Sequence, residues 1–288
     1  MKTIFISVFV FIIFFSSSFS QKKVQVYDAP DQAVWHEKSR TWFVSNLGGG
    51  ISLEKDANGW VTRTDEFGNV IAPFWIGKEE GMHAPSGMVA TKKFLYVVDR
   101  EGVFEINIKN EKVETFYPIP EGEFLNDVAI SESGDLYISD FFGNKIFKID
   151  AVTKKVNIWL ESDRLEAPDG LYMEKDKLIV ASWGVLLKPS SFETSKLGDL
   201  LSIDLETKNI QPIATEAGNL EGITKIKNNY YITDWAAGKL LKIDPKKQQV
   251  EIIMTGLKYP TDPNYSKKLN ILAFPQHGTN QVLFIKLN

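Results

Sequence analysis

The sequence contains no cysteine, so disulfide bonds and thiolate-ligated metal ions cannot contribute to the stability of this chain. It also lacks an excess of positive charge, because its 33 basic side chains are outnumbered by 37 acidic ones. The resulting net charge of −4 argues against general nucleic-acid binding. What remains is an ordinary folded composition, with 43% apolar and 24% charged residues among 288, which suits one large domain or two small ones.

Long apolar runs are scarce as well, and only residues 4–15 form one, which is too short to cross a bilayer comfortably. Lys2 precedes this run and the small, polar residues 16–20 follow it, a pattern typical of a cleavable export signal. We therefore predict a signal peptide over residues 1–20, a single domain over residues 21–288, and a periplasmic or secreted location. No membrane span is expected in the remaining chain.

A short motif recurs six times along the chain: an apolar residue, often followed by proline, then a polar residue, then small or apolar residues. The polar residues of the six copies are Asp31, Ser86, Asn126, Asp169, Glu221 and Thr261. Successive copies are 55, 40, 43, 52 and 40 residues apart, which matches the roughly 40–50 residues of a four-stranded propeller blade. The repeat therefore indicates six similar units within one domain.

Short β-prone segments fill each repeat, for example residues 135–140, 145–150 and 155–159, and turn residues separate them. No long amphipathic helical pattern competes with them. We predict an all-β fold, a six-bladed β-propeller with four-stranded blades. The sixth repeat has room for about three strands only, so we expect residues 23–28 to complete the last blade and close the ring.

Propeller geometry predicts two different faces. The inner strand of each blade starts at one mouth of the central channel, so the six polar residues should surround that mouth. Two long segments, 66–85 with Phe74, Trp75 and His83, and 183–199 with Trp183, are expected on the same face as pocket walls, although tolerated surface insertions are an equal alternative for each. Lysines should gather in the hairpins of the opposite face, as solvated turn residues or, alternatively, as a docking surface for anions: Lys92, Lys93, Lys154, Lys155, Lys175, Lys177, Lys246, Lys247, Lys267 and Lys268.

Three acidic residues in the predicted ring, Asp31, Asp169 and Glu221, would repel one another unless a cation neutralised them. Because the ring contains neither cysteine nor histidine, its ligands would be hard oxygens, which favour calcium, with magnesium or manganese as alternatives. The alternative is that these acids only stabilise the turns that enter the inner strands. The three histidines, His36, His83 and His277, are too scattered for a zinc site and are interpreted as surface or loop residues, with His83 nearest the rim.

Over essentially the whole mature chain, the motifs resemble those of the senescence-marker-protein and gluconolactonase-like (regucalcin-like) six-bladed propellers. The similarity lies in residues 31–35 where the family has Glu-Gly-Pro-Val-Trp, 125–127 in the third blade, 168–171 where it has Pro-Asn-Gly-Leu, and 221–223 where it has Asp-Gly. The resemblance implies that Asp31, Asp169 and Glu221 bind the metal and that Glu221 is the general base. It also implies that Asn126 contacts the metal-bound water or the substrate, while Phe124 replaces an arginine that binds substrate in some members.

Two functions of different class follow from these residues. The first is a metal-dependent hydrolase of lactones or related esters, with Asn126, Trp183 and His83 expected to contact a small-molecule substrate. The second is a non-catalytic propeller that binds a peptide, glycan or small metabolite at its rim. A strictosidine-synthase-like propeller is a weaker third possibility, because the acidic ring fits it poorly. The oligomeric state is left open.

Overall fold

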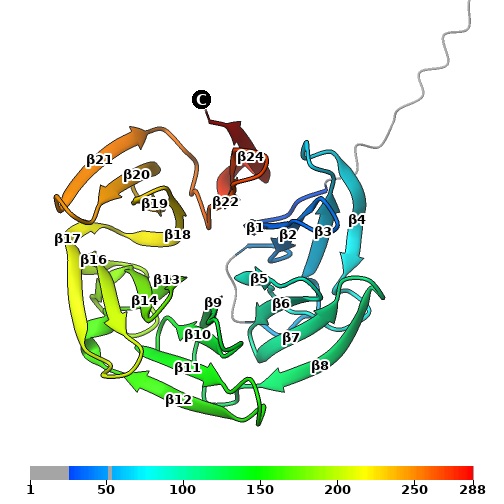
Figure 1. Ribbon diagram of the computed structural model, residues 1–288, viewed down its shortest axis with the longest axis horizontal. Helices are drawn as coiled ribbons and strands as arrows, with labels where there is room; N and C mark the ends of the chain where they lie inside the picture. The colour runs from blue at the N-terminus through cyan, green and yellow to red at the C-terminus, as the bar shows by residue number, and fades with distance from the viewer. Residues whose placement is uncertain (1–25, 51–53, 288) are drawn as a thin grey trace, which may run out of the picture.

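The structure, a computed structural model, describes residues 26–50 and 54–287, and every structural statement below concerns those residues. Six antiparallel sheets stand around a central axis like the blades of a propeller (Figure 1). This confirms the predicted all-β, six-bladed fold. In the described chain the helical elements are two short 3-10 turns, η1 (Asp163–Leu165) and η2 (His277–Thr279). No helix among these residues is long and apolar enough to cross a membrane.

The first three blades each have four strands in sequence order. Their strands are β1 (Pro30–His36), β2 (Thr41–Asn46), β3 (Trp60–Thr64) and β4 (Val70–Ile76); β5 (Met88–Ala90), β6 (Phe94–Asp99), β7 (Gly102–Asn107) and β8 (Lys112–Pro118); β9 (Leu125–Ile130), β10 (Leu136–Asp140), β11 (Lys145–Ile149) and β12 (Val156–Glu161).

The fourth blade carries an additional strand, and the sixth has one fewer than the others in the described chain. The strands of blades four to six are β13 (Pro168–Glu174), β14 (Lys177–Ser182), β15 (Gly184–Leu186), β16 (Thr194–Asp204) and β17 (Ile210–Gly218); β18 (Leu220–Ile226), β19 (Asn229–Asp234), β20 (Lys239–Asp244) and β21 (Gln249–Met254); β22 (Asn264–Ser266), β23 (Ile271–Gln276) and β24 (Gln281–Lys286).

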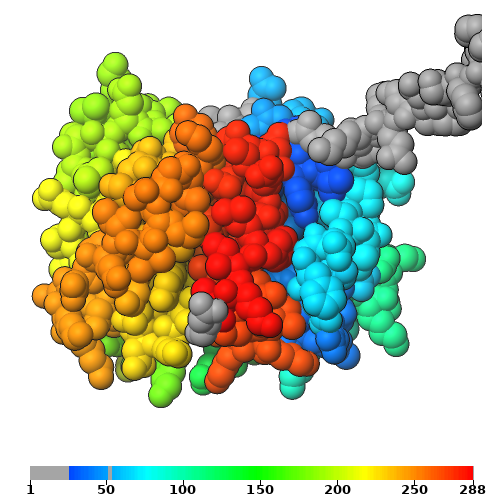
Figure 2. All heavy atoms as spheres, turned by 90° about the horizontal axis from the view of Figure 1, so that it is seen from above, coloured from blue at the N-terminus to red at the C-terminus, as the bar shows by residue number. Residues whose placement is uncertain are grey.

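The first and last blades join without a shared strand in the described part of the chain. Residues 26–28 form no strand there, and the rest of the expected closing strand, 23–25, lies outside the described residues, as does the predicted signal peptide. The Asp262 N–H donates to the Asp31 carbonyl at 3.1 Å, and the Ala29 N–H donates to Asn280 Oδ1 at 2.8 Å. Figure 2 shows the last blade packed directly against the first.

The core lies between neighbouring blades rather than in one central mass. For example, Phe43 of β2 is fully buried in the same apolar cluster as Val97 of β6, and Ile138 of β10 shares a cluster with Val98 of β6. The inner strands contact one another around the channel, while outermost strands such as β8 and β21 are mostly exposed. Burial of apolar area between blades therefore supplies the cohesion that disulfides provide in many exported proteins.

Of the two long segments predicted to be pocket walls, only the second reaches the channel mouth. Residues 70–76 form β4, the outer strand of the first blade, where Trp75 packs on Phe43 and Phe74 packs on Trp60, at centroid distances of 4.6 and 5.1 Å. Phe74 and Trp75 are therefore blade residues and not pocket walls. The β-prone run 70–76 was not recognised as a strand, because the spacing of the motif made all of segment 66–85 look like a connection. The second long segment does reach the channel mouth.

Candidate functional site

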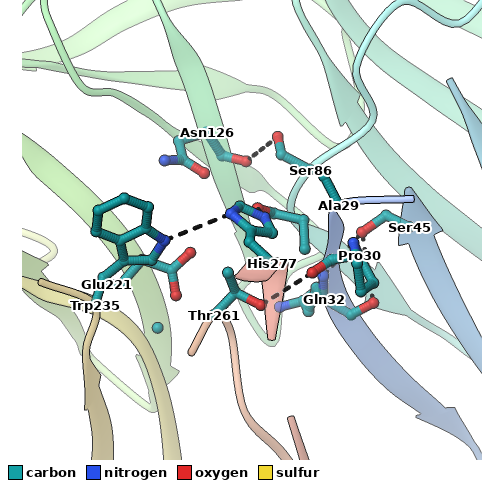
Figure 3. A network of polar contacts seen from close by, with 12 residues as sticks. Ala29, Pro30, Gln32, Ser45, Ser86, Asn126, Glu221, Trp235, Thr261 and His277 are labelled. Atoms are coloured by element: carbon teal, nitrogen blue, oxygen red, sulfur yellow. Dashed lines mark hydrogen bonds and ion pairs between the residues drawn. The ribbon is translucent and has the colours of Figure 1, made fainter. Parts of the chain in front are cut away.

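The recurring polar residues all enter the channel at one mouth, where the inner strands begin. Asp31, Asn126, Asp169 and Glu221 are buried near the starts of β1, β9, β13 and β18, and Ser86 and Thr261 lie just before β5 and β22. They also connect neighbouring blades, since Ser86 Oγ donates to the Asn126 carbonyl at 2.6 Å and Thr261 Oγ1 donates to the Pro30 carbonyl at 3.2 Å (Figure 3).

Strained turns deliver three of these residues to the channel. Ala29, Ala167 and Tyr259, each followed by proline, have φ angles of 46°, 57° and 52°. This left-handed region is unfavourable for residues other than glycine, asparagine and aspartate. Strain repeated at the same position of three blades indicates that the surrounding structure holds these turns in place in order to aim the next residues inward.

Glycines after the ring residues let neighbouring inner strands approach closely. A Cβ atom on Gly170 would lie 2.2 Å from the Glu221 carbonyl oxygen, and one on Gly222 would lie 1.8 Å from Asp262 Oδ1. Any other side chain at these positions would push two blades apart at the channel. The Asp-Gly and Glu-Gly pairs of the motif are therefore required by packing as well as by chemistry.

A second ring of residues lies above the first. It consists of the residue that directly follows the second strand of each blade: Leu47, Arg100, Phe141, Trp183, Trp235 and His277. In the second and third blades the aspartate that ends the second strand fixes the entry turn: Asp99 accepts from the Ala84 N–H at 2.7 Å, and Asp140 accepts from the Phe124 N–H at 2.7 Å. Each blade thus contributes one floor residue and one rim residue by the same local geometry.

The two rings enclose a narrow cavity at the channel mouth. It has a volume of ≈ 30 Å³, room for one or two water molecules, and its floor contains Asp31, Asp169 and Glu221. Phe192, from the turn between β15 and β16, covers it and packs on Trp183 and Phe124, with centroid distances of 5.9 and 6.1 Å. The predicted pocket wall in segment 183–199 is therefore present, but it narrows the mouth in this structure.

The carboxyl groups of the channel destabilise one another. Burial raises the pKa of Asp169 well above its ordinary value, and the nearby charges of Asp31 and Asp127 raise it further. Burial likewise raises the pKa of Glu221 well above its ordinary value, with Asp262 as the largest charged contributor. Asp127 and Asp262 lie one residue beyond the floor ring, so the negative charge extends deeper into the channel than the six motif positions suggested.

Two cationic or basic side chains oppose this charge. Arg100 is buried among the acids, and although burial lowers its pKa, the charges of Asp31, Asp99 and Asp169 act in the opposite direction. Its guanidinium donates to the Leu125 carbonyl at 3.1 Å and stacks 4.2 Å from the Phe124 ring centroid. An arginine therefore does reach this cavity, from the second blade instead of the position occupied by Phe124.

His277 is the other; it lies in the connecting turn η2, as expected of a loop residue, but it lines the cavity, a position that was expected of His83. Its Nε2 lies 3.1 Å from Asp31 Oδ1. Its Nδ1 lies 3.5 Å from Trp235 Nε1 (Figure 3). The indole N–H can only donate, so Nδ1 is the acceptor and the neutral ring carries its proton on Nε2, facing Asp31. A carboxylate that orients an imidazole in this way is a common device for proton transfer.

The donor set of the floor was tested against the predicted calcium ion. In favour, the donors are hard oxygens and Asp31 Oδ2 is buried with no hydrogen-bond partner. Against it, no three histidine, aspartate or glutamate side chains of the described chain are arranged so that they could hold a metal ion. Asp31 Oδ1 is paired with His277, and Asp169 Oδ1 accepts from the Asn126 amide. The residues as arranged do not form a calcium site, and the ion stays a prediction.

The predicted site residues therefore fall into two groups. The structure brings Asp31, Asn126, Asp169, Glu221 and Trp183 together around one cavity. His83 does not line it; its Nδ1 accepts from the Ala57 N–H at 3.0 Å and its Nε2 lies 3.4 Å from Glu101 Oε2. Arg100 and His277 were not predicted at the cavity, although they share with the predicted Trp183 the position directly after the second strand of a blade, a signal that could have identified them.

Comparison with known proteins identifies solved structures of similar fold. No protein-family model matches the sequence, and no curated protein sequence matches it. Among solved structures, a gluconolactonase from Xanthomonas campestris is similar with a TM-score of 0.67 at 13% identity, covering 91% of this chain and 88% of that one. Virginiamycin B lyase from Staphylococcus aureus is similar with a TM-score of 0.57 at 14% identity, covering 90% and 95%. At such identities the likeness confirms the predicted gluconolactonase-like resemblance for the fold.

Proposed function

We propose that the protein is an enzyme that cleaves lactones or related esters at the closed cavity of the channel mouth. The observation that carries this proposal is the convergence of an oriented histidine, an arginine and buried carboxyl groups on one water-sized space. The fold it shares with a gluconolactonase supports the choice of bond.

The side chains on the floor and rim would divide the work of hydrolysis. The Asp31 carboxylate, oriented by the His277 Nε2–H and with its Oδ2 free of hydrogen bonds within the described residues, would take the proton of the attacking water as the oxygen bonds to the carbonyl carbon. The Arg100 guanidinium, which stays charged, would hold the oxyanion that forms. Glu221, which burial favours in its protonated form, would give its own proton to the alkoxide that leaves when the carbon–oxygen bond of the ester breaks. The proton held by Asp31 would then return to Glu221 by exchange with water. This general-acid role differs from the general-base role that the resemblance implied.

A histidine is required for activity in one protein of similar fold. In virginiamycin B lyase, a variant with one histidine replaced by alanine is catalytically inactive, and it was solved with quinupristin. That protein's activity is its own. His277 is the histidine that lines the cavity here, so it is the first residue to vary.

The requirement for calcium, with magnesium or manganese as alternatives, remains a separate prediction. No step above uses the ion, because the acids do not form a ligand set. Export likewise remains a prediction that depends on residues 1–20. Metal analysis of the purified protein, before and after dialysis against a chelator, tests the first, and the N-terminal sequence of the mature protein tests the second.

A non-catalytic binding module is the second candidate, and one observation favours it. The cavity of ≈ 30 Å³ cannot hold a lactone unless Phe192 or its neighbours move. A binding module needs only the rim, where Trp235 stacks on Tyr259 at 4.3 Å and is ready to receive a planar or sugar-like ligand.

Turnover assays separate the two candidates. The purified protein is given a panel of lactones and esters, and Glu221→Gln is compared with Glu132→Gln, an exposed residue of the opposite face. We expect hydrolysis by the wild type, a loss of about 10²–10⁴-fold in Glu221→Gln, and no change in Glu132→Gln. Unchanged turnover in Glu221→Gln would reject its role, and saturable binding with no turnover of any substrate would favour the binding module.

A further inference from the structure

A second and larger cavity opens on the opposite face, between the first two blades. It has a volume of ≈ 790 Å³, within the range of small-molecule sites. Three hairpin turns surround it, those joining β1 to β2, β5 to β6 and β7 to β8, and Arg63 of β3 contributes to its wall. We call it the hairpin groove.

The hairpin groove carries an excess of positive charge. Two of its cations are paired, Arg63 with Glu111 at 2.9 Å and Lys93 with Glu114 at 3.8 Å. The other three form no ion pair within the described residues: Lys38, Lys92 and Lys109. Five cations against two carboxylates leave a formal charge of +3 in a protein whose net charge is −4.

A buried histidine, His36, forms part of the wall of the groove. His36 Nδ1 accepts from the Ser39 N–H at 3.3 Å and lies 2.6 Å from Ser39 Oγ, so the neutral ring carries its proton on Nε2. His36 is 5% exposed, and its ring backs the turn that contains Thr91 and Lys92. Burial lowers its pKa, which the nearby carbonyls of Lys92 and Thr91 partly offset.

Another lysine-containing hollow, at blade five, shows that this excess is not a general property of the face. The hollow of ≈ 280 Å³ at blade five contains Lys242 and Lys247. There, Lys242 pairs with Glu251 at 2.8 Å and Lys247 pairs with Asp244 at 3.8 Å, so its charges balance. Charge is left unbalanced in the hairpin groove, where lysines of three separate turns meet.

We propose that the hairpin groove binds a small molecule carrying a phosphate or sulfate group. Such a group has two or more charged oxygens for Lys38, Lys92 and Lys109, and a groove of this volume has room for a sugar-sized remainder. This site is independent of the channel mouth, so its failure would leave the proposed ester cleavage untouched, and the converse also holds.

Calorimetric titration with defined probes tests the proposal. The probes are glucose 6-phosphate, inorganic phosphate, and glucose as the neutral match, at low ionic strength. We expect one saturable site for glucose 6-phosphate, weaker binding of inorganic phosphate and none of glucose. The ring signals of His36 in nuclear magnetic resonance spectra should shift on addition of glucose 6-phosphate.

A matched pair of triple variants locates the site. Lys38→Gln, Lys92→Gln and Lys109→Gln together remove the unpaired charges of the groove, while Lys155→Gln, Lys177→Gln and Lys246→Gln remove as much charge from other exposed turns of the same face. The first should weaken glucose 6-phosphate binding by at least about 10-fold, and the second by less than about 2-fold. Equal losses in both, binding of vesicles with anionic lipid but of neither phosphate probe, or no binding at all would overturn the proposal.

Discussion

The channel mouth and the hairpin groove handle charge in opposite ways. At the mouth, Asp31, Asp169 and Glu221 are buried together around a cavity of ≈ 30 Å³. In the groove, Lys38, Lys92 and Lys109 are exposed on flexible side chains around ≈ 790 Å³. Charges interact strongly where water is excluded and weakly where it is present, so single substitutions should matter far more at the mouth than in the groove.

The largest difference should come from two histidines, one inside the mouth and one outside it. His277→Ala removes the partner of Asp31 and is expected to lower kcat/KM for an ester substrate by about 10³-fold. His83→Ala, which lies off the cavity, should leave it nearly unchanged. Steady-state kinetics with both variants decides this, and equal effects would mean that the mouth is not the reaction centre.

Glycine substitutions should show the next largest contrast. Gly170→Ala places a Cβ 2.2 Å from the Glu221 carbonyl oxygen, and we expect it to cost about 3 kcal/mol of unfolding free energy, because backbone atoms cannot rotate away. Gly134→Ala, in a hairpin of the other face, meets nothing closer than 3.4 Å and should cost about 1 kcal/mol through its positive φ alone. Denaturant titrations measure both, and similar costs would contradict the close approach of the inner strands.

Stability should also depend on pH through the mouth and its channel. Burial raises the pKa of Asp127 to about 7, above its ordinary 3.8, so the folded state holds this proton more tightly than the unfolded state does. The associated stability is full below about pH 4 and is lost as the pH rises towards about 7. We expect Tm to fall by several degrees across that range and the slope to be shallower in Asp127→Asn. An unchanged slope in thermal scans of that variant would contradict this origin.

The smallest effects should come from the hairpin face. Replacing Lys246 by glutamine is expected to change the unfolding free energy by less than about 0.5 kcal/mol, because its charge is exposed and forms no ion pair within the described chain. Thermal scans of this variant provide the baseline for the others. A loss above about 1 kcal/mol would mean that this face is structurally more constrained than its exposure indicates.

The fold and the floor of the mouth were predictable because both follow from the repeat. One polar position per blade, such as Asp169, marks the start of an inner strand, and the geometry of a closed ring places all such positions together. The position of the lysines was predictable too, because adjacent strands run in opposite directions and so place alternate hairpins on the face opposite the mouth. Residues 70–76 were misplaced because their strand pattern lies inside a segment that the motif spacing made look like surplus.

The rim could not be found from residue types alone. Arg100 and His277 occupy equivalent positions in their blades, but leucine, phenylalanine and tryptophan stand there in the others, so no shared chemistry marks the position. Its regularity lies in the backbone, directly after the second strand. The closure of the mouth by Phe192 depends on how a long turn folds back over the ring, which no periodic pattern specifies.

The Asp31–His277 contact spans 246 positions of sequence and joins the first blade to the last. A nascent or truncated chain without its C-terminal blade therefore cannot assemble this proton-transfer pair, however well its earlier blades have folded. Catalytic competence would appear in one step, when the two ends of the polypeptide meet, and activity would report completion of folding.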